Sequence, residues 1–256
     1  MTSSFALASR RLHPEDPEWE ARLALLGRFH LEVRSRKVVI SPSVQRLLAL
    51  LALHPEGVTR PFVASALWPD LPDRRAGASL RSTLWRLTRS SGRDGLVDAG
   101  DSCLALAPTV GVDLHEAERH AASLVSPHDS GPAPLPALAE LSEDLLPDWT
   151  EDWLLVAREH FRQTRLHALE AVSRHLRDGG QLAAAMETAM TAVEAEPLRE
   201  SAHRHVVGVH LAEGNVAEAL RHYDFFRRMI RSELGLGPSA GFRRLMAPYL
   251  SRPLDP

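Results

Sequence analysis

The hydrophobic positions near the start of the chain repeat first with the period of a strand. Apolar and polar side chains alternate from Leu25 to Val33, and the polar stretch Arg34–Lys37 precedes the apolar residues Val38–Ile40. Alternation over this length is typical of a strand with one buried face. The pattern therefore predicts two strands joined by a polar turn.

The pattern then changes to the helical period. Ser41 and Pro42 form a helix start, because serine caps free amides and proline suits the first helical position. The stretch Val44–His54 is apolar on nearly every side, which predicts a central, buried helix. Thr59 can cap a shorter helix over Arg60–Leu67. That helix would pack through Phe62, Val63 and Leu67.

A third predicted helix, Asp73–Ser90, has two chemically different sides. Its apolar stripe consists of Ala76, Leu80, Thr83, Leu84 and Leu87. Its opposite side carries Arg74, Arg75, Arg81, Ser82, Trp85, Arg86 and Arg89. No acidic residue follows Asp73, which can cap the helix, and Gly92 can end it. Such a helix suits the major groove of DNA, and a solvated, arginine-rich surface helix is the alternative interpretation.

After this helix the pattern predicts a β-hairpin. Leu96–Asp98 and Leu104–Leu106 flank the turn-forming residues Ala99–Ser102. Strands, three helices of which the third is basic, and a terminal hairpin follow in the order of an α+β winged helix-turn-helix domain. A generic α+β domain is the alternative, but it requires neither a buried first helix nor a basic third one.

The second half of the chain is predicted to be all helical. A Pro-rich stretch at 125–137 separates it from the first half, and helical periods cover 149–177, 181–195, 198–212, 216–234 and 239–250. Leu176–Gly179 recurs as Leu211–Gly214 at an offset of 35 residues, close to the tetratricopeptide period of about 34. The pattern predicts paired helices that present a groove to protein partners, with an ordinary helical bundle as the alternative.

Charge divides the chain at the same place. Residues 1–112 carry 15 Lys and Arg against 11 Asp and Glu, whereas residues 113–256 carry 15 against 22. This asymmetry favours nucleic acid as the partner of the first half and protein as the partner of the second. With 44% hydrophobic and 25% charged residues, the composition is that of a soluble globular protein.

The sequence lacks the motifs of an enzyme. Cys103 is the only cysteine, which excludes a disulfide framework or thiolate cluster and favours the cytosol. The only lysine, Lys37, follows an arginine, so no Walker A motif exists. The 13 histidines form no HExxH motif, and GxSxG is absent. We therefore predict no catalytic residue, no metal and no cofactor. The longest aliphatic run, Leu47–Leu53, is too short to span a membrane.

Several motifs resemble those of the SARP-type transcriptional activators of actinobacteria. In the first half they are Leu26-Gly27-x-Phe29, Gln45–Leu51, Ala66-Leu67-Trp68, Arg86-Leu87 and Val112-Asp113-Leu114. In the second half, Glu196-Pro197-Leu198-Arg199-Glu200-x-x-His203 and Glu233-Leu234-Gly235-x-x-Pro238 are similar to the most specific strings of that family. The resemblance extends over residues 23–250.

The resemblance implies an OmpR-like winged-helix DNA-binding domain over 23–112, after a mobile extension at 1–22. It implies a bacterial transcriptional activation domain with tetratricopeptide-like helices over 113–256. Such a protein binds direct repeats in double-stranded promoter DNA as a head-to-tail homodimer. It recruits RNA polymerase holoenzyme with its sigma factor, usually at secondary-metabolite (antibiotic) gene clusters. It would act in the cytoplasm, on the nucleoid, without a membrane partner. The alternative is a protein-interaction regulator that acts through its helical repeats with a weakened DNA-binding module.

The basic helix supplies the expected DNA contacts. Arg74, Arg75 and Arg89 would bind phosphates and so fix the register on DNA. Arg81 and Arg86 would read guanine, and Ser82 and Arg93 belong to the same predicted surface. Trp85 would either contact a thymine methyl group or cover the core beneath the wing.

The predicted wing differs from that of the family. The family usually has a basic residue and several glycines there, whereas this chain has Asp98–Cys103. Because Asp98 and Asp101 would repel phosphates, we expect the wing to contribute little to DNA binding.

Overall fold

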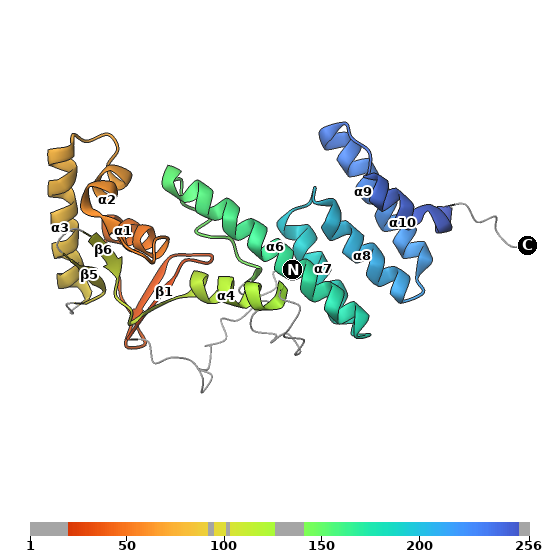
Figure 1. Ribbon diagram of the computed structural model, residues 1–256, viewed down its shortest axis with the longest axis horizontal. Helices are drawn as coiled ribbons and strands as arrows, with labels where there is room; N and C mark the ends of the chain where they lie inside the picture. The colour runs from red at the N-terminus through yellow and green to blue at the C-terminus, as the bar shows by residue number, and fades with distance from the viewer. Residues whose placement is uncertain (1–19, 92–94, 101–102, 126–140, 251–256) are drawn as a thin grey trace, which may run out of the picture. The chain divides into compact units, whose positions relative to one another are not determined.

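The structure is a computed structural model that describes residues 20–91, 95–100, 103–125 and 141–250. It divides into two compact units (Figure 1). Unit 1 comprises the chain up to Leu23 and His30–Val112, and unit 2 comprises Ala24–Phe29 and the chain from Asp113 onward. The expected mobile extension and the expected Pro-rich loop lie almost entirely outside the described residues.

Unit 1 has the predicted α+β winged helix-turn-helix fold. Its elements are β1 (Ala21–Ala24), β2 (His30–Val33), β3 (Arg36–Lys37), α1 (Pro42–Ala52), β4 (Val58–Thr59), α2 (Arg60–Leu67), α3 (Asp73–Ser91), β5 (Val97–Ala99), β6 (Cys103–Leu106) and β7 (Val110–Val112). One sheet has the strand order β3-β2-β1-β7, in which β1 and β7 are parallel. The other has the order β4-β6-β5, and its β5–β6 hairpin is the wing.

The prediction of one strand over Leu25–Val33 is wrong. β1 ends at Ala24 and β2 begins at His30. Between them Gly27 has a φ of 74°, a left-handed conformation that glycine adopts easily and that a regular strand does not contain. The alternation of apolar residues in the sequence therefore continues across a segment that is not a strand.

The second predicted strand is displaced toward the turn. The turn consists of Arg34 and Ser35, which both have a positive φ. Directly after it, β3 pairs with β2 over Arg36–Lys37, and Val38–Ile40 lies beyond the strand. The first strand is displaced as well, since β1 begins at Ala21, within the stretch expected to form the extension.

The three helices of unit 1 begin where their caps were predicted or one residue away. Ser41 stands at the N-cap position of α1, which has Pro42 at its start, but its hydroxyl makes no capping hydrogen bond and lies 3.2 Å from the Ser43 hydroxyl instead. The Thr59 hydroxyl does accept a hydrogen bond from the Phe62 amide, at 3.4 Å. Asp73 is the first residue of α3 and not its cap. The Pro72 carbonyl accepts the first bonds of that helix instead.

The core of unit 1 surrounds α1. Its leucines Leu47, Leu48, Leu50 and Leu51 are buried, as the apolar pattern predicted. Val63 and Leu67 of α2 are buried as well, whereas Phe62 is 43% exposed and packs edge-on against His54. Two of the three residues predicted to anchor α2 therefore do so.

Unit 2 is all helical, with tetratricopeptide-like helix pairs. Its elements are α4 (Asp113–Val125), the 3-10 helix η1 (Asp152–Leu154), α6 (Leu155–Asp178), α7 (Leu182–Ala195), α8 (Glu200–Ala212), α9 (Val216–Leu234) and α10 (Ala240–Leu250). Each helix from α6 to α10 packs against the next along the chain (Figure 1). The sequence pattern did not predict α4.

The internal repeat has an offset of 34 residues, not the predicted 35. Gly180 and Gly214 occupy equivalent turns, each with a φ of 75°. The residue after each glycine donates a backbone hydrogen bond at 2.8 Å: Gln181 to the Leu176 carbonyl and Asn215 to the His210 carbonyl. Ala185 and Ala219, one repeat apart, are both fully buried where paired helices meet. The prediction had aligned Gly179 with Gly214, because two consecutive glycines leave the register ambiguous.

The segment Ala24–Phe29 is bound within unit 2 by the carboxylate of Asp113. This carboxylate accepts hydrogen bonds from the amides of Leu25 at 2.8 Å and Leu26 at 3.1 Å. Farther along, the Gly27 amide donates to the Asp144 carbonyl at 2.7 Å. Two of the motifs in the first half of the chain, at 26–29 and 112–114, thus meet in this contact.

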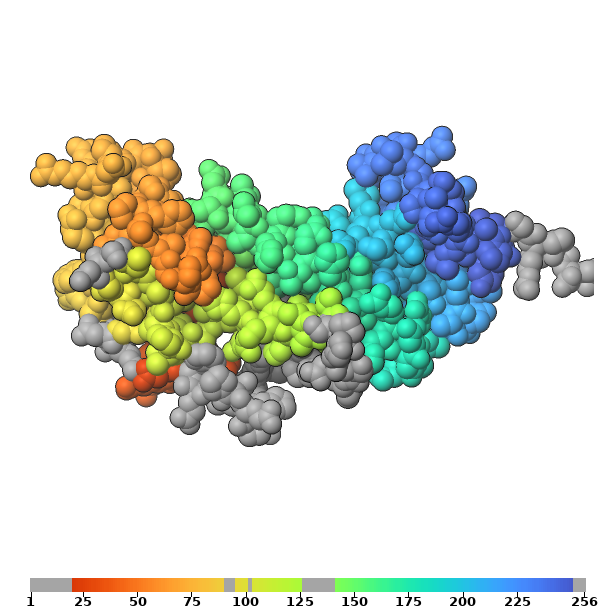
Figure 2. All heavy atoms as spheres, in the orientation of Figure 1, coloured from red at the N-terminus to blue at the C-terminus, as the bar shows by residue number. Residues whose placement is uncertain are grey.

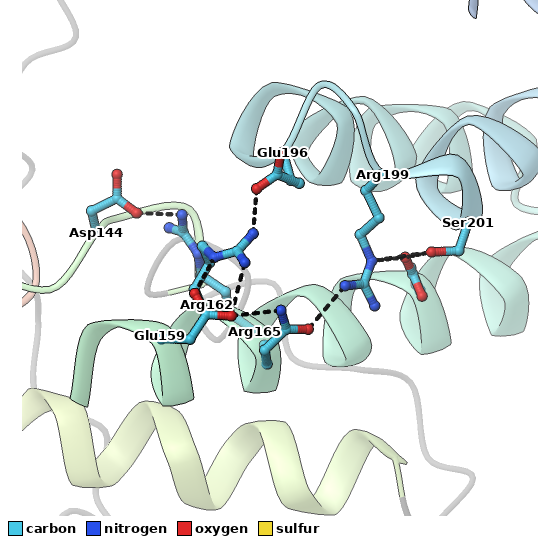
Figure 3. Close-up of polar contacts among 9 residues, drawn as sticks. Asp144, Glu159, Arg162, Arg165, Glu196, Arg199 and Ser201 are labelled. Atoms are coloured by element: carbon cyan, nitrogen blue, oxygen red, sulfur yellow. Dashed lines mark hydrogen bonds and ion pairs between the residues drawn. The ribbon is translucent and has the colours of Figure 1, made fainter. Parts of the chain in front are cut away.

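Two arginines of α6 hold the loop against which this segment lies. Arg158 donates to three backbone carbonyls between residues 145 and 149. Arg165, which is buried, donates to the Glu143 carbonyl at 2.8 Å and forms an ion pair with Asp144 (Figure 3). Guanidinium groups satisfy carbonyls that no regular element pairs.

The motif at Glu196–His203 joins the helices of unit 2 to one another. Glu196 pairs with Arg162 of α6, which also binds Glu159 (Figure 3). Hydrogen bonds from Arg162 and Gln163 lower the pKa of Glu159 to about 2. The motif thus fixes the α7–α8 turn to α6 through a charged network.

The arginine of the motif makes a second bond to α6. Arg199 lies 2.6 Å from the Glu170 carboxylate, which also accepts a hydrogen bond from the Ser201 hydroxyl (Figure 3). Burial alone would raise the pKa of Glu170, but these two partners lower it below its usual value. Glu200 binds the Ser239 amide at 2.6 Å and so reaches the start of α10.

The histidine of the motif is fully buried between two partners. One ring nitrogen of His203 lies 2.8 Å from the Pro197 carbonyl, and the other lies 2.9 Å from His222 of α9. Because a carbonyl only accepts, His203 donates to Pro197 and accepts from His222. Burial and the neighbouring His203 and His210 lower the pKa of His222 to about 4, and burial also lowers the pKa of His203.

We predict that Asp113→Ala lowers the free energy of unfolding by about 1–3 kcal/mol, because it leaves the amides of Leu25 and Leu26 without their acceptor. Urea unfolding measures this difference. Asp113→Asn, which retains one acceptor oxygen, should lose about half as much. Equal stability of the wild type and the alanine variant would contradict the role given to this carboxylate.

We also predict that unit 2 becomes less stable as the pH falls from 6.5 toward 4. The unfolded chain binds protons at histidine with a pKa of about 6.5, whereas His222 in the folded chain requires a pH near 4. The contribution of the neutral His203–His222 pair to the free energy of unfolding is therefore fully present above pH 6.5, and it is lost as the pH falls toward 4. His222→Gln should reduce that loss by about 1–2 kcal/mol, with solvent screening considered.

Urea unfolding at several pH values tests this prediction. His167→Gln is the matched control, because it removes an exposed histidine of α6 that lies outside the His203–His222 pair. Parallel stability curves for His222→Gln and the wild type would show that the pair is not responsible.

Candidate nucleic-acid interface

Helix α3 lies with one side against the core of unit 1 and the other in solvent (Figure 1). Its buried side consists of Ala76, Leu80, Thr83 and Leu87. Leu84 is half-buried, so the predicted apolar stripe is confirmed. At the end of α2, before the short turn that leads into α3, the Leu67 carbonyl accepts a hydrogen bond from Arg46 of α1 at 2.8 Å.

Each described residue of the predicted DNA-binding surface is exposed. These are Arg74, Arg75, Arg81, Ser82, Trp85, Arg86 and Arg89. In the view of Figure 2, the outer side of α3 (orange-yellow) is not covered by another element of unit 1. The structure therefore gathers these side chains on one helix face, and Arg93 lies outside the described residues.

The arginines of this face differ in their partners from those of unit 2. On α9, Arg221 pairs with Glu218 and Arg227 pairs with Asp224. On α3, no arginine has a carboxylate partner among the residues that the structure describes. Among the residues that the structure describes, no acid neutralises the charge of the α3 face, which is therefore available to an external anion.

Trp85 does not cover the core beneath the wing. Its side chain is 59% exposed, and the Cζ atom of Arg89 lies 4.8 Å from the centre of its ring. This exposure disagrees with the alternative in which Trp85 covers the core, and the contact with a thymine methyl group stays a prediction. The contact with Arg89 was not predicted, although a spacing of four residues on a helix was a signal for it.

The wing presents an acidic side chain. β5 and β6 pair antiparallel, with Asp98 opposite Ala105, and Asp98 is exposed. Arg60 at the start of α2 donates to the Gly100 carbonyl at 3.4 Å, a support for the wing that the sequence did not reveal. Asp101 lies outside the described residues.

Other kinds of site are not formed by the described residues. Among them, no group of three or more His, Cys, Asp or Glu side chains could hold a metal ion. None of the described helices combines the length and the apolar character that crossing a membrane requires. The exposed arginine face of α3 is thus the feature with the clearest binding chemistry.

Comparisons with known proteins give the same architecture. Over 93% of its length the chain is similar in structure to Mycobacterium tuberculosis EmbR, solved in complex with a low affinity phosphopeptide, with a TM-score of 0.74 and 20% identity. The match covers 67% of the EmbR chain. No curated protein matches the chain.

The second half of the chain identifies the family. Residues 112–249, more than half of the chain, match the model of the bacterial transcriptional activator domain. This range runs from the start of α4 to the last turn of α10 and contains both of the specific strings that carried the resemblance. The chain therefore belongs to the bacterial transcriptional activator domain family, and it is a transcriptional activator of the SARP type.

Proposed function

We propose that this protein activates transcription by binding specific promoter DNA through α3. The DNA would contain direct repeats, on which two copies bind head to tail. Unit 2 would then recruit RNA polymerase holoenzyme with its sigma factor, at a secondary-metabolite (antibiotic) gene cluster. Arg74, Arg75, Arg81, Ser82, Trp85, Arg86, Arg89 and Arg93 would form the DNA-binding surface.

One observation carries this proposal. The exposed side of α3 holds five described arginines without a carboxylate partner among the described residues, while its other side packs on the core of a winged helix-turn-helix fold. A helix of this kind fits the major groove, where guanidinium groups bind guanine edges and phosphates. The second half of the chain adds the activator family.

The acidic wing favours a second candidate function. Exposed Asp98 lies on the hairpin that would approach the DNA backbone, and like charges repel there. A regulator with a weakened DNA-binding module would act through the paired helices of unit 2 alone. A gel shift with genomic fragments and competitor DNA separates the two, because only the first function gives fragments that resist competition.

We predict that Arg86→Ala and Arg89→Ala weaken DNA binding in different ways. Arg86→Ala should cost about 1–3 kcal/mol at the mapped site and relax specificity at one base pair. Arg89→Ala should weaken all sequences about equally and flatten the salt dependence by about one unit, because it removes one phosphate contact. Titrations against the site and its single-base variants measure both effects.

Arg227→Ala on α9 is the control for these variants, since Arg227 lies in unit 2 and pairs with Asp224. It should bind DNA as the wild type does. Unchanged binding of Arg86→Ala to the mapped site would show that the assignment of this arginine to a base is wrong.

We further predict that removing the acids of the wing tightens DNA binding without improving specificity. Asp98→Arg with Asp101→Gly should increase affinity for specific and non-specific DNA alike, because the added charge meets phosphate. The salt dependence should steepen by about one unit for the added cation. Measurement of the affinities for specific and non-specific DNA across a salt series tests this prediction.

The competing hypothesis is that one of these carboxylates accepts a hydrogen bond from cytosine or orients Arg86. The double variant would then lose affinity at the specific site while its non-specific binding rises. That selective loss would overturn the view of the wing as a weak contributor.

A further inference from the structure

Trp85 and Arg89 form a stacked pair on the exposed side of α3. The Cζ atom of Arg89 lies 4.8 Å from the centre of the Trp85 ring, a distance at which a cation is attracted to the face of an aromatic ring. The two residues are four positions apart, so their side chains are neighbours on the helix surface. Since Trp85 is 59% exposed, the pair forms in solvent and not in the core.

Packing of the fold does not account for this tryptophan. It borders a shallow crevice between α3 and the wing, which Leu87, Thr88 and Val97 also line. More than half of its side chain nevertheless remains in water. The side chain that the indole contacts in solvent is Arg89.

Stacking orients the guanidinium of Arg89 and leaves its donors free. A guanidinium on a ring uses its flat face, while its N–H groups point outward from the edge. A phosphate can accept two of these N–H groups at once. An unrestrained arginine loses side-chain entropy when it binds, and stacking removes part of that loss in advance. Among the described residues no carboxylate pairs with Arg89 and could orient it instead.

We propose that Trp85 is a positioning residue for Arg89. By stacking, it holds the guanidinium in the orientation in which two N–H groups can bind a DNA phosphate. This inference rests on the proposed DNA binding and deepens it. Trp85 then contributes to affinity for any DNA sequence through the arginine and makes no contact of its own with a base. The expectation that it contacts a thymine methyl group is replaced by this role.

A double-mutant cycle tests the proposal on the full chain. Dissociation constants of the wild type, Trp85→Ala, Arg89→Ala and the double variant are measured for the mapped site and for a non-specific duplex across a salt series. Trp85→Phe retains an aromatic face, and Trp85→Leu is the matched control with an apolar side chain that has none. Thermal melting of each variant reports whether the fold is intact.

Trp85→Ala should weaken binding to both duplexes by roughly two- to fivefold, the effect of an exposed cation–ring contact. In the Arg89→Ala background it should have no further effect. Trp85→Phe should bind nearly as the wild type, and Trp85→Leu as weakly as Trp85→Ala. Arg89→Ala alone should flatten the salt dependence by about one unit, while Trp85→Ala leaves it unchanged because the charge remains.

The proposal is overturned by an equal loss from Trp85→Ala in the presence and absence of Arg89, by a loss confined to the mapped site, or by full binding of Trp85→Leu. A lower melting temperature of Trp85→Leu than of Trp85→Phe would also overturn it, because the ring would then support the fold. If no genomic fragment resists competitor, the proposed specific binding fails, and the non-specific duplex at low salt still measures the coupling of the two residues.

Discussion

The carboxylate of Asp113 is the contact that holds the early segment Ala24–Phe29 within unit 2. It accepts hydrogen bonds from the amides of Leu25 and Leu26, which lie 88 and 87 residues before it in the sequence. The chain consequently passes between the units at three places, near 24, 30 and 113. A fragment cut after α4 would keep Asp113 and lose the Asp144 carbonyl that binds Gly27.

Local signals in the sequence predicted most of the elements, because caps and apolar periods act over a few residues. Ser41-Pro42 and Thr59 precede α1 and α2 as expected, and α9 covers the predicted residues 216–234. The same locality explains why the exposed side of α3 was predictable. Its buried and solvent-exposed residues are separated by the helical period alone, and no distant part of the chain alters that division.

The features that the sequence did not predict depend on distant partners or on backbone conformation. Gly27 interrupts an alternating pattern, and nothing nearby distinguishes a glycine within a strand from one that ends it. The repeat offset depended on which of Gly179 and Gly180 adopts the left-handed conformation. Helix α4 had an acidic first turn at Asp113 and Glu116, but the short motif that contains Asp113 concealed the start of a helix. The stack of Trp85 on Arg89 was hidden because each residue had a separate expected role.

The two units use arginine in opposite ways, and this difference connects the fold to the proposed function. In unit 2, Arg162, Arg165 and Arg199 bind carboxylates and carbonyls that join helices. Their charge is therefore already paired within the folded protein. Breaking such a partly buried pair leaves an uncompensated charge and destabilises the protein. The arginines of α3 have no such partner among the described residues, and the helix is held by its apolar side instead. Their loss should therefore affect binding and not folding, which is the property that a recognition surface requires.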